Sequence, residues 1–237
     1  MEERELNILA LDTSGPVAGC ALMMDGRIVH SIAALHGCTH SESIMPMVDQ
    51  ALSESGITVL QLDCIAAVAG PGSFTGVRIG VCAAKGLAHA ANVPCARVNA
   101  LEALAMNFPG FRGTVAPLLD ARRSQAYCAA FDLSQGTPRR LMEDRALPIE
   151  AFLEALPEEG DVLFLGDGLD AFREAARAAL GTRALFAPAH LRDLKPESAC
   201  ALAALDPDRW MSAEKLTPIY LRAPQAERER ARREGHV

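Results

Sequence analysis

The chain has 237 residues, half of them hydrophobic, which is enough for one large or two small domains with buried cores. Its 23 Lys and Arg residues are outnumbered by 30 Asp and Glu residues, and the net charge of −7 argues against nucleic-acid binding by this chain alone. The acidic N-terminus and the lack of an apolar run of ~20 residues predict neither a signal peptide nor a membrane span, so we expect a cytoplasmic protein.

The first half of the chain shows an α/β order of strands and helices. A D25G turn joins the second and third strands, which predicts an antiparallel hairpin. Ser41 or Ser43 is expected to cap the first helix, which ends at Gly56. The predicted strands cover residues 6–11, 17–24, 27–34, 65–69 and 95–98, and the predicted helices cover residues 41–55, 75–90 and 99–107.

A strand, a glycine turn and a smooth helix form the centre of this pattern. The apolar run 65–69 ends in G70PG72, and Ser73 or Thr75 can cap the helix that follows. Gly76 and Gly80 lie inside this helix, and each costs about 1 kcal/mol relative to Ala. They therefore predict that another backbone approaches the helix closely. Such a junction can also bind a phosphate at the helix N-terminus or be a plain tight turn, and both interpretations stay open.

The second half repeats the pattern in a degenerate form. Its first strand, 114–119, ends in Asp120 as the first strand of the chain ends in Asp12, and G166DG168 stands where G70PG72 stood. We therefore expect two related lobes with a cleft between them. The first lobe is predicted to cover residues 1–108, completed by 206–237, and the smaller second lobe residues 109–205. The Arg-rich tail after Ala226 is predicted to be a solvated end or a binding arm.

Several motifs, in order along nearly the whole chain, resemble the TsaB (YeaZ) family of bacterial tRNA threonylcarbamoyladenosine synthesis. The matching strings are L9ALDTS14, H40SESIMP46, G70PGSFTGVRIG80, V98NALEALA105, P117LLDARRSQAY127 and P218IYLR222. The resemblance implies the fold of the actin, Hsp70 and sugar-kinase superfamily, with two ribonuclease-H-like lobes of which the second is shortened.

The resemblance also implies a function in a complex. TsaB proteins are similar to TsaD, the subunit that transfers the threonylcarbamoyl group to N6 of adenosine 37 in tRNAs reading codons that begin with A. They bind TsaD and keep it active. Together with the ATPase TsaE, and with threonylcarbamoyl-AMP made by TsaC, they complete the modification. The chain is thus expected to be a non-catalytic partner subunit that contacts tRNA only through the complex and forms a homodimer when alone.

Two histidine patterns bear on metal binding. TsaD-like catalytic subunits carry a His-x-x-x-His pair, and the resemblance places Ala100 and Leu104 at its two positions, so no metal is expected there. His36 and His40 have the same spacing elsewhere, where a helix would bring them together. They are interpreted either as a metal pair or as part of a loop that enters a helix. The seven scattered cysteines are expected to be reduced thiols.

Two aspartates carry the alternative hypothesis of an ATP-dependent phosphotransferase. Asp12 and Asp120 occupy the positions of the two phosphate loops in the actin-like superfamily, where aspartates hold Mg²⁺ or orient the attacking group. Asp12 can equally be a residue that only caps a strand end. No cofactor is expected for the isolated chain, although ATP or ADP could be shared at the interface of the complex. The candidate phosphate-loop residues are Asp12, Thr13, Ser14, Gly72 and Ser73.

The helices 41–55 and 75–90 are the candidate partner interface. The first has an apolar stripe with methionines and the second a face of glycine and alanine, so the pair can pack against a similar pair as a four-helix bundle. Either face can also serve only inside the lobe. The resemblance favours the interface, and the candidate residues are Ile44, Met47, Val48, Ala51, Gly76, Gly80, Val81, Ala84 and Leu87.

Overall fold

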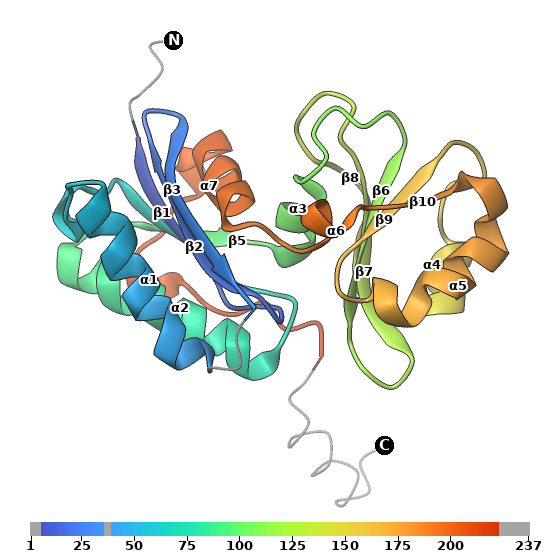
Figure 1. Ribbon diagram of the computed structural model, residues 1–237, viewed down its shortest axis with the longest axis horizontal. Coiled ribbons are helices and arrows are strands. Elements are labelled where there is room, and N and C mark those ends of the chain that lie inside the picture. Colours follow the sequence, from blue (N-terminus) through green and yellow to red (C-terminus); the bar gives the residue numbers. More distant parts are fainter. Residues whose placement is uncertain (1–5, 36–38, 223–237) are drawn as a thin grey trace, which may run out of the picture.

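Two five-stranded mixed sheets, each covered by helices, make up the molecule (Figure 1). The structure is a computed structural model, and it describes residues 6–35 and 39–222. We call the sheet of β1 to β5 with its helices the first lobe, and the sheet of β6 to β10 with its helices the second lobe. In the described part of the chain, no helix is long and apolar enough to cross a membrane.

The first sheet has the strand order β3-β2-β1-β4-β5. β1 pairs antiparallel with β2 and β2 with β3, which confirms the predicted hairpin, whereas β4 and β5 run parallel to β1. All five residues of β4 are buried, as its uninterrupted apolar run predicts. The strands are β1 (Asn7–Asp12), β2 (Ala18–Met24), β3 (Arg27–Ala34), β4 (Cys64–Val68) and β5 (Cys95–Val98).

Helices cover both faces of the first sheet. α1 (His40–Glu54) and α2 (Phe74–Ala91) lie on one face and share a core with β1 and β4. The other face carries α7 (Pro196–Leu205), while α3 (Ala100–Ala105) lies between the two sheets (Figure 1).

The N-terminal caps of α1 and α2 were predicted with unequal success. Thr39, not Ser41 or Ser43, caps α1, because the Glu42 carboxylate accepts the Thr39 backbone N–H at 2.9 Å and so completes a capping box. Ser41 and Ser43 lie inside the helix. The cap of α2 is one of the two predicted residues, Ser73, whose hydroxyl accepts the backbone N–H of Gly76 at 3.2 Å.

The second sheet repeats the first, with the order β8-β7-β6-β9-β10. In both lobes the first strand lies at the centre, two antiparallel strands follow it on one side, and two parallel strands lie on the other. This is the ribonuclease-H-like arrangement, and the predicted fold class is confirmed. The strands are β6 (Thr114–Asp120), β7 (Gln125–Asp132), β8 (Arg139–Pro148), β9 (Val162–Leu165) and the unpredicted β10 (Ala184–Phe186).

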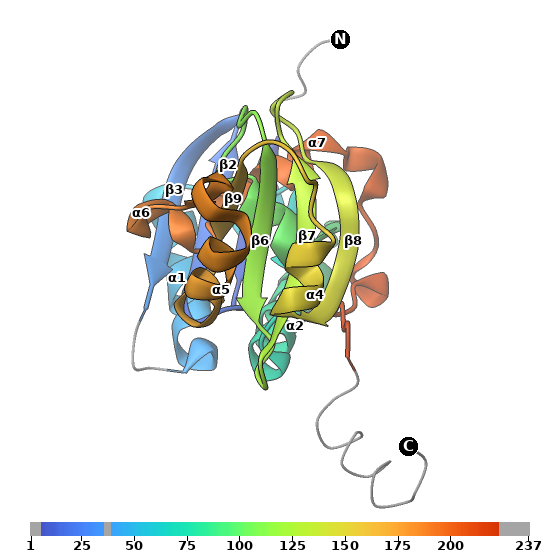
Figure 2. The ribbon, with the colours of Figure 1, turned by 90° about the vertical axis from the view of Figure 1, so that its right-hand side faces the viewer.

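The two longer helices of the second lobe lie on one face of its sheet. α4 (Ile149–Glu154) and α5 (Leu169–Leu180) cover the face that points away from the first lobe, as Figures 1 and 2 show. The short α6 (Ala189–Arg192) leads back toward the first lobe. The opposite face of the sheet packs on α3. The two lobes therefore share one core around α3.

The chain returns to the first lobe earlier than the sequence predicts. α7 falls within the predicted second lobe, yet Cys200 is buried against β1 and β2, with its sulfur 3.5 Å from the carbonyl oxygens of Ile8 and Ala21. We therefore propose a lobe boundary before Pro196. The tail 223–237 lies outside the described residues. The six cysteines that the structure describes are free thiols, and all except Cys82 are buried.

Candidate functional site

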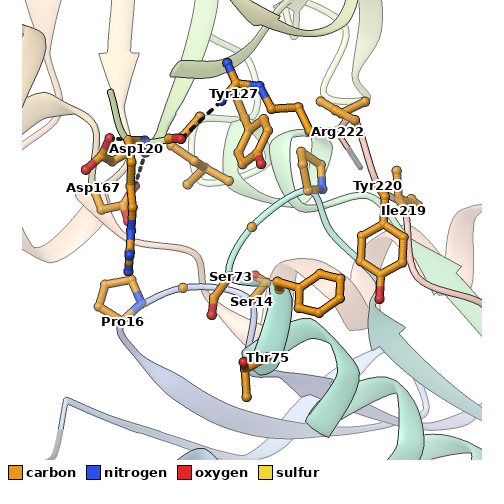
Figure 3. A pocket seen from close by; sticks show the side chains of 18 of the residues that line it. Ser14, Pro16, Ser73, Thr75, Asp120, Tyr127, Asp167, Ile219, Tyr220 and Arg222 are labelled. Atoms are coloured by element: carbon orange, nitrogen blue, oxygen red, sulfur yellow. Dashed lines mark hydrogen bonds between the residues drawn. The ribbon is translucent and has the colours of Figure 1, made fainter. Parts of the chain in front are cut away.

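A cleft of about 660 Å³ lies between the lobes, where β1 and β6 end and α2 begins (Figure 3). Both lobes and the C-terminal segment contribute walls. Its polar lining includes Ser14, His40, Ser73, Thr75, Asp120, Arg122, Tyr127, Asp167, Tyr220 and Arg222.

Asp12 lies behind this cleft. Its side chain is 3 % exposed and borders a separate cavity of about 20 Å³ rather than the cleft itself. Its Oδ1 accepts the backbone N–H of Ser14 at 2.8 Å and the Ser14 hydroxyl at 2.7 Å. Burial raises the pKa of Asp12 to about 6, although these hydrogen bonds and His40 lower it in part. The carboxylate is thus used to order the loop that follows β1, as the strand-cap interpretation predicts.

The backbone that approaches the smooth helix α2 belongs to this same loop. A Cβ at Gly76 would overlap the carbonyl oxygen of Thr13, and one at Gly80 would lie 2.5 Å from the Thr13 hydroxyl. That hydroxyl donates a hydrogen bond of 2.7 Å to the carbonyl oxygen of Gly76. These glycines are therefore required for packing inside the first lobe. The sequence predicted that another backbone approaches the helix closely, but not which segment supplies it.

The N-terminus of α2 is partly occupied by the chain itself. The Ser73 N–H donates to the Ser14 carbonyl oxygen at 2.7 Å, and the Gly76 N–H donates to the Ser73 hydroxyl. A Cβ at Gly72 would also overlap the Ser14 carbonyl oxygen. Two donors that a phosphate would need at this end are therefore used, which favours the tight turn over the phosphate site.

The second lobe contributes two carboxylates to the cleft. Asp120 is exposed, its backbone N–H donates to Asp167 Oδ1 at 3.0 Å, and its own Oδ1 accepts the Arg122 N–H at 2.7 Å. Burial raises the pKa of Asp167. The turn after Asp120 is unusual, because Arg122, Arg123 and Ser124 all have positive φ angles of 61°, 55° and 57°. Non-glycine residues rarely adopt this conformation, so three in succession make this turn beside the cleft an uncommon one.

The C-terminal crossing, residues 216–222, forms a wall of the cleft that sequence reasoning did not assign to the site. The Tyr220 hydroxyl accepts a hydrogen bond of 2.7 Å from Arg78 Nε, and its ring lies 5.2 Å from the ring of Phe74. Arg222 reaches the second lobe, where it donates to the Ala121 carbonyl oxygen at 3.3 Å. The aromatic and cationic residues of P218IYLR222 were the sequence signal that could have assigned this segment to the site.

The candidate partner-interface residues lie mostly inside the first lobe. Eight of the nine are buried, and only Leu87 is partly exposed. The apolar stripe of α1 packs on β2 and β3, and the small face of α2 packs on β4 and on the loop after β1. These faces are used within the lobe, so a partner would have to meet the outer faces of the two helices instead. This corrects the choice of Ile44, Met47, Val48, Ala51, Gly76, Gly80, Val81 and Ala84.

The structure places the residues of the two histidine patterns in different environments. Ala100 and Leu104 are fully buried in the core around α3. The His40 ring lies 2.9 Å from the Gly15 carbonyl oxygen, through Nε2, whereas its predicted partner His36 lies outside the described residues. Within residues 6–35 and 39–222, no three His, Cys, Asp or Glu side chains are grouped as metal ligands.

Comparison with known proteins places the chain in a family. Residues 31–229 match the family model of TsaD, tRNA N6-adenosine threonylcarbamoyltransferase. The chain is 33% identical to the tRNA threonylcarbamoyladenosine biosynthesis protein TsaB of Bacillus subtilis, over 94% of this chain and 96% of that protein. Identity to the TsaB protein of Escherichia coli is 31%, over 92% and 95% of the two chains.

A solved structure and a catalytic relative complete the comparison. YeaZ from Pseudomonas aeruginosa superposes with a TM-score of 0.78 at 32% identity, over 91% of this chain and all of that one. The tRNA N6-adenosine threonylcarbamoyltransferase of Chlorobium limicola is 36% identical, but over only 41% of this chain and 32% of that protein. The full-length likeness is thus to the shorter proteins, and the chain belongs to the TsaB (YeaZ) family of tRNA threonylcarbamoyladenosine biosynthesis proteins.

Proposed function

We propose that this chain is a non-catalytic subunit that binds a TsaD-type protein and activates it for threonylcarbamoyl transfer to adenosine in tRNA. The observation that carries the proposal is the core around α3. The two positions that correspond to the histidine pair of catalytic subunits are Ala100 and Leu104, both fully buried. Neither side chain can ligate a metal, so the chain would act through a catalytic partner.

The outer faces of α1 and α2 are the surface proposed for that partner. Met45 and Cys82 are exposed, and Ile79 and Leu87 are partly exposed, so apolar side chains remain on the side that faces away from the sheet. The two helices pack side by side on the first sheet (Figure 1). A similar helix pair from a TsaD-type protein could pack there as a four-helix bundle. A second copy of this chain would use the same surface when TsaD is absent.

Single substitutions on α2 test this surface. Cys82→Arg places a charge on the outer face and should weaken binding to purified TsaD by about 100-fold, because the guanidinium must be desolvated. Thr182→Arg, on an exposed turn of the second lobe, is the matched control and should bind normally. Isothermal titration calorimetry measures both. Normal binding by Cys82→Arg would contradict the proposed surface. Ala84→Arg is unsuitable as a probe, because Ala84 is fully buried and the charge would unfold the lobe.

The cleft supports a second candidate, an ATP-dependent phosphotransferase. The hydroxyls of Ser73 and Thr75 and the carboxylates of Asp120 and Asp167 line a space large enough for a nucleotide. Against it, Asp12 is buried and bonded to Ser14, so it does not face a nucleotide in the cleft. Calorimetric titration of the isolated chain with Mg-ATP separates the two proposals. Tight binding that is lost in Asp120→Asn would favour the phosphotransferase, whereas the scaffold proposal predicts no tight binding.

The remaining components of the complex follow from the same proposal. A TsaE-type ATPase and the tRNA would bind the assembled complex, since the net charge of −7 disfavours direct contact between this chain and tRNA. ATP or ADP would then be held between subunits, with the cleft as one half of the site. A cytoplasmic location is part of this proposal.

A further inference from the structure

A groove of about 610 Å³ runs between α4 and α5 on the outer side of the second lobe. Figures 1 and 2 show both helices on the side of the molecule that faces away from α1 and α2. No part of the proposed function uses this surface. The groove is lined by residues of α4, of the connection after it, and of the second half of α5.

The bottom and one wall of the groove are apolar. Leu153 and Leu156 belong to the core of the second lobe and are 8% and 6% exposed. The wall on α5 consists of Ala175, Ala178 and Ala179, of which the last two are exposed. Alanine side chains let a second helix come within about 8–10 Å of the helix axis. The shape therefore suits the apolar face of a helix better than a flat protein surface.

Three acidic side chains line the groove and take part in none of the ion pairs among the described residues. Glu150, Glu154 and Glu158 line it and are exposed, and no ion pair within residues 6–35 and 39–222 includes any of them. The one cation in the lining, Arg183, already donates to the carbonyl oxygens of Gly160 at 2.8 Å and Pro157 at 2.5 Å. Three carboxylates thus remain available to a ligand.

The basic side chains of α5 lie on its other flank. Arg173 and Arg177 stack on the ring of Phe186, at 4.5 and 5.4 Å from its centroid, and are held on the side of β10. They do not line the groove. Within residues 6–35 and 39–222, a ligand in the groove would therefore meet apolar carbon and negative charge, with Arg183 as the only lining cation.

We propose that this groove binds a basic amphipathic helix of a protein partner. Its Leu and Ala side chains would cover Leu153, Leu156 and the alanine wall, and flanking Lys or Arg side chains would pair with the three glutamates. A second copy of this chain is a poor occupant, because a two-fold interface would bring the three carboxylates against three more. The inference is independent of the proposed function, since it concerns a different lobe and a different surface.

Fluorescence anisotropy with synthetic helices tests the proposal on the full chain. The probe is a labelled, hydrocarbon-stapled 14-residue helix with a Leu and Ala stripe flanked by Lys, and the matched probe carries Glu at every Lys position. The Lys helix should bind saturably, and the Glu helix should bind at least about tenfold more weakly. Ala179→Arg and Glu154→Lys should each weaken binding of the Lys helix by about tenfold or more.

The control variant separates groove binding from general attraction to an acidic protein. Asp208→Lys changes the net charge as Glu154→Lys does, but lies on an exposed turn after α7, and should leave the affinity within about twofold. Equal losses in Asp208→Lys and Glu154→Lys would overturn the proposal, as would unchanged binding in Ala179→Arg or no saturable binding of the Lys helix. Dimerisation of the chain that Ala179→Arg abolishes would assign the groove to a second copy and also overturn it.

Discussion

The two lobes share one sheet topology but differ in the burial of the loop that follows their first strand. Asp12, at the end of β1, is buried, whereas Asp120, at the end of β6, is exposed in the cleft. Each lobe has a glycine with positive φ after its fourth strand, Gly70 at +108° and Gly166 at +105°. The helices that follow these glycines differ. α2 contains glycines against which the loop after β1 packs closely, whereas α5 contains no glycine.

This difference shows how a duplicated fold can lose symmetry at its functional edge. In the first lobe, α2 packs closely against the loop of Asp12, and the buried carboxylate accepts hydrogen bonds from Ser14, so it serves the structure. In the second lobe, the corresponding loop stays open, and its turn of three residues with positive φ borders the cleft. Chemistry that needs an accessible carboxylate from each lobe is therefore disfavoured.

The contact between α2 and the first loop should give the largest effect on stability. Gly76→Ala places a methyl group against the Thr13 carbonyl oxygen and should cost about 3 kcal/mol or more in the free energy of unfolding. Gly86→Ala, in the same helix, meets nothing within 4 Å and should stabilise the protein by about 0.5–1 kcal/mol. Urea unfolding measures both changes. Equal effects of the two substitutions would contradict the close approach.

The buried carboxyl of Asp12 should make stability depend on pH. Because burial raises its pKa from 3.8 to about 6, the folded state binds the proton more tightly than the unfolded state does. The free energy of unfolding should therefore fall as the pH rises through this range, by about 3 kcal/mol relative to Asp12→Asn, which cannot titrate. Urea unfolding of both proteins at several pH values between 4 and 7 tests this. A constant difference would show that Asp12 is not desolvated.

The glycine turns of the two lobes can be compared directly. A Cβ at Gly72 overlaps the Ser14 carbonyl oxygen, whereas one at Gly168 lies 3.0 Å from the Leu118 carbonyl oxygen. Gly72→Ala should cost about 2 kcal/mol and Gly168→Ala about 1 kcal/mol or less. Thermal unfolding provides the measurement. A larger cost at Gly168 would mean that the second lobe, not the first, has the tighter junction.

The smallest effect is expected at the C-terminal crossing. Tyr220→Phe removes the hydrogen bond from Arg78 but keeps the ring beside Phe74, so it should cost less than about 1 kcal/mol because the site is exposed. Tyr220→Ala removes the ring as well and should cost more. If both variants unfold like the unsubstituted chain, the crossing contributes no measurable stability to the wall of the cleft.

Much of the fold could be predicted because its signals are local. The D25G turn, the apolar run before Gly70 and the repeat of Asp12 by Asp120 each depend on a few neighbouring residues. The cap of α1 was assigned to the wrong residue because Ser41 and Ser43 have the same capping chemistry as Thr39. Glu42, three residues after Thr39, completes a capping box with it, and neither serine has a Glu or Gln at that spacing.

The candidate site was harder to predict because its contacts join distant segments. Periodicity shows that α1 and α2 have apolar faces, but not whether a face meets its own sheet or another molecule. The glycines of α2 required a close backbone, and that backbone is Thr13, 63 residues before Gly76. Tyr220 in the C-terminal crossing lies 142 residues after its partner Arg78. The sequence signal for this contact was limited to the aromatic and cationic composition of the crossing. Local patterns do not report such pairings.

The most direct test of the account is threonylcarbamoyl transfer to tRNA by purified TsaD, TsaC and TsaE, with and without this chain. An activating scaffold predicts that transfer requires the added chain and survives Asp12→Asn and Asp120→Asn, each confirmed to be folded. If either substitution abolishes transfer while the complex with TsaD still forms, a carboxylate of this chain takes part in the chemistry and the account is wrong.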